Sequence, residues 1–85
     1  MKTLTEAEIE SWEAAVIARI AAHVQSKLWA DGMSLRQAAP GAGISFNTLA
    51  RVQRGGLSPS LTTLLRLLAW LDLQPLDLIP RRETR

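Results

Sequence analysis

Apolar residues recur every three or four positions through the first third of the chain. They form one helical stripe, made of Ile9, Trp12, Val16, Ile20, Val24 and Leu28. Thr5 and Glu8 have the spacing of a capping box at the start of this stripe. Gly32 follows its last turn, where a left-handed residue commonly ends a helix. The pattern predicts one long helix over about residues 6–31.

Two shorter helices are predicted next, each starting after a serine cap. Ser34 and Gln37 have capping-box spacing, and Pro40-Gly41 is expected to end that helix early because proline lacks the N–H that continues it. Ser45 caps a helix from Phe46 to about residue 53, which Gly55-Gly56 ends. Gly43 lies in the tight turn between the two helices.

Two further helices complete an all-α domain of five helices. Ser60 caps the fourth, whose expected core face carries Leu61, Leu64, Leu65 and Leu68. The fifth is short, from Leu76 to Ile79, with Pro75 at its first position and Pro80 as its stop. No segment shows the alternation typical of a strand.

Composition limits the class of protein. Eighty-five residues suffice for one small domain. The sequence has no cysteine and one histidine, His23, and it lacks nucleophile-elbow, P-loop and metal-ligand motifs, so we expect no enzyme, no cofactor and no metal site. His23 is interpreted as a surface or partly buried helical residue. The apolar runs are too short for a membrane span, and a cytoplasmic location is the default expectation.

Charge is segregated along the chain. Residues 1–13 carry one Lys and four Glu, a net charge of −3, whereas residues 32–71 contain four Arg and no acid. Residues 80–85 carry a net charge of +2. The middle of the chain is therefore suited to face a polyanion, and its acidic start is not.

Two short helices joined by a tight glycine turn describe a helix-turn-helix. The spacing of several short motifs in this region is similar to that of one known family. The motifs are Gly32-Met33-Ser34, Ala39, Gly43-Ile44-Ser45, Thr48-Leu49, Arg51-Val52, Arg54-Gly55, Pro59-Ser60-Leu61, Thr63-Leu64-Leu65 and the leucines up to residue 73. Together they resemble the Cro and phage-repressor (Xre-type) helix-turn-helix family. The resemblance covers residues 32–79, a little over half of the chain.

The resemblance implies a five-helix Cro/repressor-like domain that regulates transcription by binding double-stranded DNA. We divide the chain into an extended N-terminal helix (1–31), a helix-turn-helix core (32–79) and a basic tail (80–85). The expected activity is that of a repressor or autorepressor of a phage or mobile element, bound as a homodimer to a palindromic operator, with residues 46–53 in the major groove.

The resemblance also assigns DNA contacts. The residues expected to touch bases are Phe46, Asn47, Ala50 and Arg51. Asn can bond adenine and Arg can bond guanine bidentately. Open alternatives are a Phe46 ring folded onto the core, an Asn47 that is only a first-turn polar residue, and an Arg51 that binds phosphate or stays in solvent. The expected phosphate contacts are Ser34, Arg36, Gln37, Ser45, Thr48, Arg54, Gly56 and Ser60. Arg66 is expected in solvent.

Some positions depart from the family pattern. Leu35 stands where members often carry Gln, and Pro40-Gly41-Ala42 replaces a helix-forming stretch. Leu28 and Gln53 occupy the positions at which many members have an Arg–Glu ion pair. We expect an apolar contact there instead.

Surplus apolar residues predict an interface. The expected homodimer contacts are Trp12, Val16, Trp70, Leu73, Leu76 and Ile79, on the N-terminal extension, the C-terminal helices or both. The alternative is that the long helix only lengthens its own core.

A second functional class stays open. The acidic N-terminal helix with its apolar flanks would suit a protein-interaction module, such as an antitoxin that neutralises a partner protein. RNA binding is a weaker third option, because no aromatic stacking platform is present.

Overall fold

The described part of the chain is entirely helical. The structure, a computed structural model, describes residues 3–56 and 59–78, and no strand occurs among them. The elements are α1 (Glu6–Asp31), α2 (Leu35–Ala42), α3 (Phe46–Gln53), α4 (Leu61–Leu71) and the 3-10 helix η1 (Pro75–Asp77). The all-α prediction is confirmed. The count of five helices is not, because the fifth is a three-residue 3-10 helix instead of an α-helix and its expected end, Ile79, lies outside the described residues.

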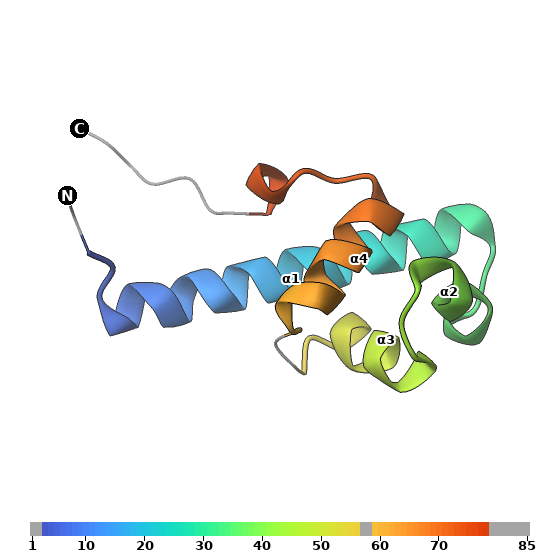
Figure 1. Ribbon diagram of the computed structural model, residues 1–85, viewed down its shortest axis with the longest axis horizontal. Helices are drawn as coiled ribbons and strands as arrows, with labels where there is room; N and C mark the ends of the chain where they lie inside the picture. Colours follow the sequence, from blue (N-terminus) through green and yellow to red (C-terminus); the bar gives the residue numbers. More distant parts are fainter. Residues whose placement is uncertain (1–2, 57–58, 79–85) are drawn as a thin grey trace.

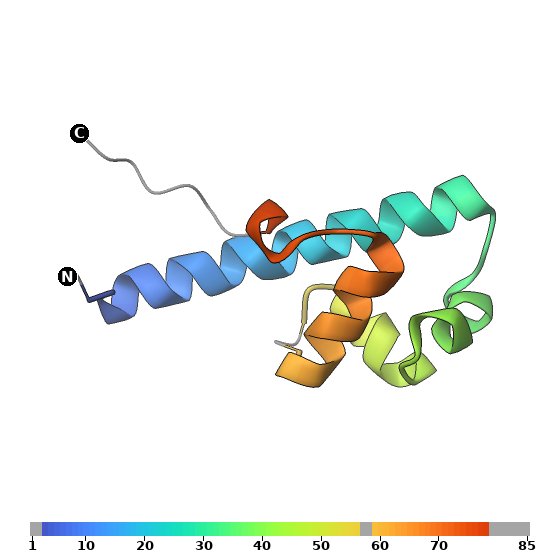
Figure 2. The same ribbon diagram turned by 45° about the horizontal axis from the view of Figure 1, so that its top comes forward.

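The long axis of the molecule is set by α1. Its N-cap is the predicted capping box: Thr5 Oγ1 accepts the Glu8 N–H at 3.1 Å, and a Glu8 carboxylate oxygen accepts the Thr5 N–H at 2.9 Å. Gly32, at φ 63°, ends the helix as predicted. The molecule measures 44 × 21 × 18 Å, and the N-terminal part of α1 projects beyond the other helices in both ribbon views (Figures 1 and 2).

The short helices gather on the C-terminal part of α1. There α2 and α3 lie side by side on one side of it, α4 crosses it, and η1 rests on another side (Figure 1). The guanidinium of Arg19 donates to the Leu78 carbonyl at 3.2 Å and ties the segment after η1 to α1. This arrangement leaves α2 and α3 with one face on the core and one face outward.

Pro40 does not shorten α2, contrary to our prediction. The helix continues to Ala42 and ends at Gly43, whose N–H donates to the Ala39 and Pro40 carbonyls. Proline removes one backbone hydrogen bond and crowds the preceding turn, whereas Ala38, Ala39 and Ala42 are all buried. Packing of this alanine face outweighs the local signal.

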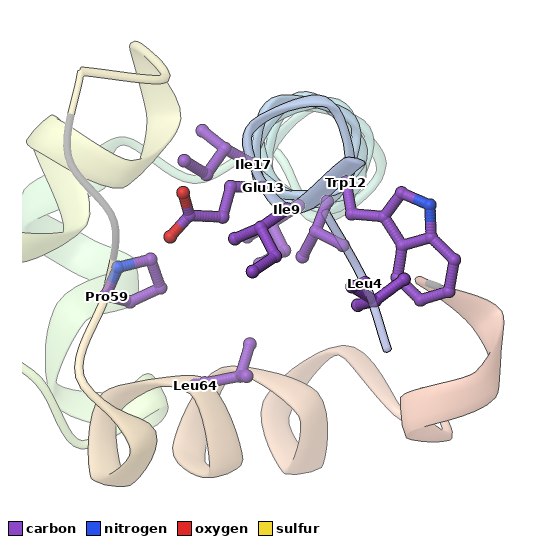
Figure 3. A pocket seen from close by; sticks show the side chains of 9 residues that line it. Leu4, Ile9, Trp12, Glu13, Ile17, Pro59 and Leu64 are labelled. Atoms are coloured by element: carbon purple, nitrogen blue, oxygen red, sulfur yellow. The ribbon is translucent and has the colours of Figure 1, made fainter. Parts of the chain in front are cut away.

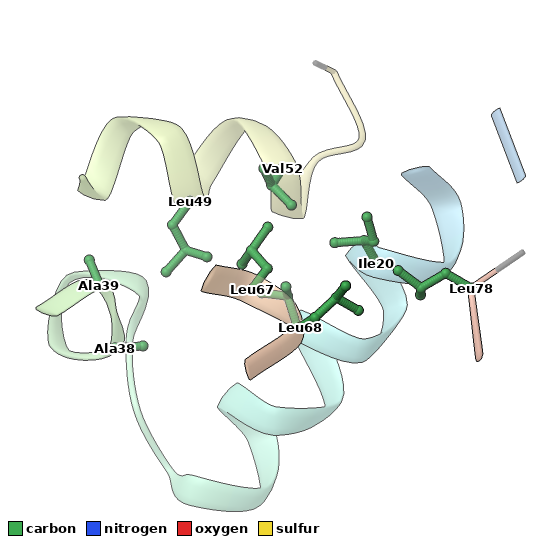
Figure 4. Packing of buried hydrophobic residues seen from close by; sticks show 9 residues of the cluster. Ile20, Ala38, Ala39, Leu49, Val52, Leu67, Leu68 and Leu78 are labelled. Atoms are coloured by element: carbon green, nitrogen blue, oxygen red, sulfur yellow. The ribbon is translucent and has the colours of Figure 1, made fainter. Parts of the chain in front are cut away.

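The core is built by all four α-helices and Leu78 (Figure 4). Its fully buried large side chains are Ile20, Val24, Leu49, Val52 and Leu67. The predicted core face of α4 was partly wrong. Leu61 and Leu65 are 71% and 54% exposed, while Leu67, which was not among the four leucines expected in the core, is fully buried. Leucines occur on more than one side of this helix, so the spacing of apolar residues does not show which side packs on the core.

Two alanine substitutions should separate the role of Gly41, inside α2, from that of Gly43, which ends the helix. Gly43 has φ 74°, and an added Cβ would lie 3.7 Å from Arg66 Cδ, so Gly43→Ala costs backbone strain without a clash. We expect it to destabilise the fold by about 1 kcal/mol. Gly41 is inside α2, and its added Cβ would meet Trp70 Nε1 at 3.8 Å, an ordinary contact. Gly41→Ala should therefore stabilise by about 0.5–1 kcal/mol. Urea unfolding of both variants measures the difference, and equal effects would contradict this account of the turn.

Candidate nucleic-acid interface

The turn between α2 and α3 has the geometry of a helix-turn-helix connection. Gly43 is left-handed, Ile44 is half-buried against the core, and Ser45 is the N-cap of α3. The Arg66 guanidinium reaches across from α4 and donates to the Gly43 carbonyl at 2.7 Å. Arg66 is thus exposed but bonded, and it helps to hold the turn; the sequence had suggested only a solvent-facing side chain.

The N-terminal turns of α2 and α3 meet through Arg36 and Phe46. The Arg36 guanidinium carbon lies 4.3 Å from the centroid of the Phe46 ring, a cation–π geometry. Phe46 is half-buried and packs against the core cluster on its other side. The ring is therefore held between the core and the guanidinium. This agrees with the alternative, left open by the sequence, that Phe46 folds back onto the core. Only its exposed part remains for a base.

Asn47 and Arg51 form the outward face of α3. They are four positions apart and both exposed, whereas Ala50 and Thr48 are half-buried and Leu49 is fully buried. Residues at this spacing are neighbours on a helix surface. Neither Asn47 nor Arg51 makes an ion pair or side-chain hydrogen bond within the described ranges, so both remain available to a ligand.

The three serine caps differ in what their hydroxyls still offer. Ser34, Ser45 and Ser60 each accept the N–H of the residue three positions on, at 3.1–3.2 Å. The Ser45 and Ser60 hydroxyls also donate to Thr48 and Thr63. Because a hydroxyl has one proton, those two donors are already used.

The Ser34 hydroxyl, by contrast, donates no hydrogen bond within the described residues, so its proton is available to a ligand. The Gln37 side-chain oxygen accepts the Ser34 N–H at 2.9 Å, which leaves the Gln37 amide NH₂ without a bonding partner in the described part of the chain. Ser34 and Gln37 at the start of α2 therefore still have side-chain donors to offer a phosphate.

Two predicted phosphate contacts lie where α3 ends. Arg54 is the C-cap and is exposed, and no described carboxylate pairs with it. Gly56 is also exposed, but its N–H already donates to the Arg51 carbonyl at 3.1 Å. Arg54 can reach an anion, whereas the Gly56 backbone donor is committed within the chain.

Sequence reasoning missed a polar link between α1 and α3. The Gln53 side-chain amide donates to the Gln25 side-chain oxygen. Gln53 does not make the expected apolar contact, and Leu28 packs against the core cluster instead. A glutamine one turn before Leu28 was the available signal, but its partner lies 28 residues away in sequence.

Trp29 was also missed. It is 89% exposed and lines a surface hollow with Gln25, Ser34 and Gln53, beside the start of α2. It directly follows the last stripe residue, Leu28, and so falls outside the apolar stripe of α1.

The predicted dimer contacts do not form one surface. Trp12 and Val16 line an apolar groove along the N-terminal half of α1. Trp70 and Leu73 are half-buried against their own core, with the Lys27 ammonium 5.4 Å from the Trp70 ring centroid. Leu76 is 80% exposed, and Ile79 lies outside the described residues.

The comparisons with known proteins give no family. No family model matches the chain, and neither the curated proteins nor the solved structures include a match. Within residues 3–56 and 59–78, no helix combines the length and apolarity that crossing a membrane would require.

Proposed function

We propose that this chain is a sequence-specific regulator of transcription that binds double-stranded DNA through α2 and α3. The observation that carries the proposal is the pairing of two capped helices across the left-handed Gly43. Asn47 and Arg51 point outward on the second helix, without a side-chain partner among residues 3–56 and 59–78. Asn and Arg are the side chains best suited to bidentate contacts with adenine and guanine in the major groove.

Electrostatics supports the same surface. No acidic residue occurs between Gly32 and Leu71, so no carboxylate of α2, α3 or α4 opposes a phosphate. Arg54 and the donors of Ser34 and Gln37 flank α3, where they would position it on the sugar-phosphate backbone. Phe46 and Arg36 serve mainly to fix the two helix starts relative to each other.

Selection of bound duplexes from random DNA tests the proposal. We expect a palindromic motif whose half-sites are about 34 Å apart, one turn of the double helix. Binding to the selected site should weaken steeply as salt rises, because phosphate contacts release counterions. Failure to enrich any sequence, with equal binding to all duplexes, would contradict a sequence-specific regulator.

The palindrome requires a dimer, which we place at the C-terminal segment around Leu76. This residue is the most exposed of the predicted contacts that the structure describes, whereas Trp70 and Leu73 pack partly against their own core. Leu76→Glu should convert the dimer to a monomer in sedimentation equilibrium, because it puts a charge into an apolar contact. Leu61→Glu, at a leucine that is 71% exposed on α4, is the matched control and should leave the dimer intact. A wild-type chain that is monomeric well above micromolar concentration would refute the dimer.

A second function, a protein-interaction module such as an antitoxin, is favoured by the apolar groove on α1. This groove is separate from the outward face of α3. Capture of a partner protein that persists in the double variant Asn47→Ala, Arg51→Ala would support it. The two functions are compatible within one chain.

A further inference from the structure

The N-terminal half of α1 has more apolar surface than its own domain buries. The fully buried residues of α1, Ile20 and Val24, both belong to its second half. In the first half, Ile9 is 43% exposed and Trp12 and Val16 are half-buried. A helix that served only to lengthen the core would bury this face.

These side chains form one wall of a groove. The other wall comes from Pro59 and Leu64, at the start of α4, and the groove encloses about 260 Å³ (Figure 3). It is lined by Leu4, Ile9, Trp12, Glu13, Val16, Ile17, Ile20, Pro59 and Leu64. Its volume lies below the roughly 300–1,000 Å³ of sites that enclose a drug-sized molecule. An open apolar groove of this size suits a row of side chains from another helix.

Glu13 gives the groove its charge. It is the single ionisable residue in the lining, and in Figure 3 its carboxylate lies on the same side of α1 as Ile9, toward Pro59. Glu6 and Glu10 lie on the same helix outside the lining, and α1 has no basic residue before Arg19. Arg19 itself is bonded to the Leu78 carbonyl. The groove is therefore apolar, with one carboxylate, that of Glu13, in its lining.

We propose that this groove binds an amphipathic helix of a partner protein, with apolar residues facing Trp12 and Ile9 and a Lys or Arg opposite Glu13. Charge complementarity selects this occupant. A second copy of the chain placed on the same face would bring two acidic helix halves together, and like charges at an interface are costly. The inference does not depend on the DNA-binding function, since no groove residue belongs to the outward face of α3.

A synthetic peptide tests the groove on the full-length chain. The probe is a fluorescein-labelled helix of roughly 18 residues, long enough to be helical, with leucines on one face and lysines on the other. Its matched partner has glutamates in place of the lysines. Fluorescence anisotropy should show binding of the lysine peptide and at least tenfold weaker binding of the glutamate peptide, because only the first complements Glu13.

Charge reversal locates the contact. Glu13→Lys should weaken the lysine peptide about tenfold and strengthen the glutamate peptide. Glu10→Lys makes the same change on the same helix at a residue outside the lining, and it should change either affinity about threefold or less. Equal effects of the two substitutions would overturn the proposed site.

The apolar contact has its own pair of variants. Trp12→Ala should weaken the lysine peptide by about tenfold or more, as expected for a central aromatic contact. Trp29→Ala, in the same helix but beside α2, should leave it unchanged. Both variants are expected to bind the operator as the wild-type chain does. Peptide binding and operator binding can therefore fail independently, and each result tests one proposal.

Two results would assign the groove to a different occupant and overturn the proposal. A homodimer that dissociates on Trp12→Ala would assign it to a second copy. Peptide binding that appears only after Arg81, Arg82 and Arg85 are replaced with Gln would assign it to the chain's own basic C-terminal residues. Absence of any binding of the lysine peptide to the wild-type chain would also refute it.

Discussion

Replacing Arg51 with alanine is expected to weaken binding to the selected operator by about 1–3 kcal/mol and to relax specificity at one base position. Arg51 is exposed in the last turn of α3, and no described carboxylate competes for its guanidinium. The proposed bidentate bond to guanine is lost with the side chain. Titration of Arg51→Ala against the operator and against its single-base variants measures both effects.

Arg54→Ala is the matched control, because it removes the same charge three residues later, at the C-cap of α3. A phosphate contact carries no sequence information, so its loss should weaken all duplexes about equally and lower the salt slope by about one. Even if the two variants lose similar affinity for the operator, Arg51→Ala should lose discrimination at one base position and Arg54→Ala should not. If Arg51→Ala also weakens cognate and random DNA equally, Arg51 does not read a base.

The helix starts were predictable because their causes are local. Thr5, Ser34, Ser45 and Ser60 each bond the backbone N–H three positions on. Such a bond depends only on residues within one turn, so spacing alone reveals it. The left-handed glycines at the ends of α1 and α2 follow the same logic.

Features that depend on packing were not predictable from the same sequence. Pro40 signals a break, because proline removes one hydrogen bond and crowds the preceding turn, but the alanine face of α2 is buried against elements distant in the chain. Phe46 is polar-flanked and looked outward, yet its ring is held between the core and Arg36. In each case contacts with residues distant in sequence decide the outcome against a local preference.

Side-chain bonds between helices were the least accessible part of the site. Arg66 bonds Gly43 across 23 positions, and Gln53 bonds Gln25 across 28. No periodicity or motif encodes such a pair, because it depends on where two helices cross. The outward placement of Asn47 and Arg51, by contrast, follows from the burial of Leu49 and Val52 on the same short helix.

The largest stability effect is expected at Leu67, the α4 residue that the sequence pattern placed outside the core. Its side chain is fully buried among Ile20, Leu49 and Leu68 in the cluster drawn in Figure 4. Leu67→Ala should destabilise the fold by about 2–5 kcal/mol, since it removes buried methyl groups and leaves a cavity. Leu65→Ala, at a leucine that is 54% exposed and was expected in the core, should cost under about 1 kcal/mol. Urea unfolding at one fixed protein concentration measures both, because the proposed dimer would make stability concentration-dependent.

A second variant guards against complete loss of folding. A small domain has only about 5–15 kcal/mol of stability, so Leu67→Ala can leave too little folded chain to measure. Leu67→Met conserves volume and should cost less than about 1.5 kcal/mol, which keeps the domain folded while still reporting on the site. Leu67→Ala should lower the free energy of unfolding most and Leu67→Met less. Leu65→Ala should lower it no more than Leu67→Met does. The reverse order for the two alanine variants would mean that α4 packs on the face containing Leu61 and Leu65. Rotation of α4 to that face would also remove Arg66 from Gly43, so the same measurement tests the support of the turn that presents α3.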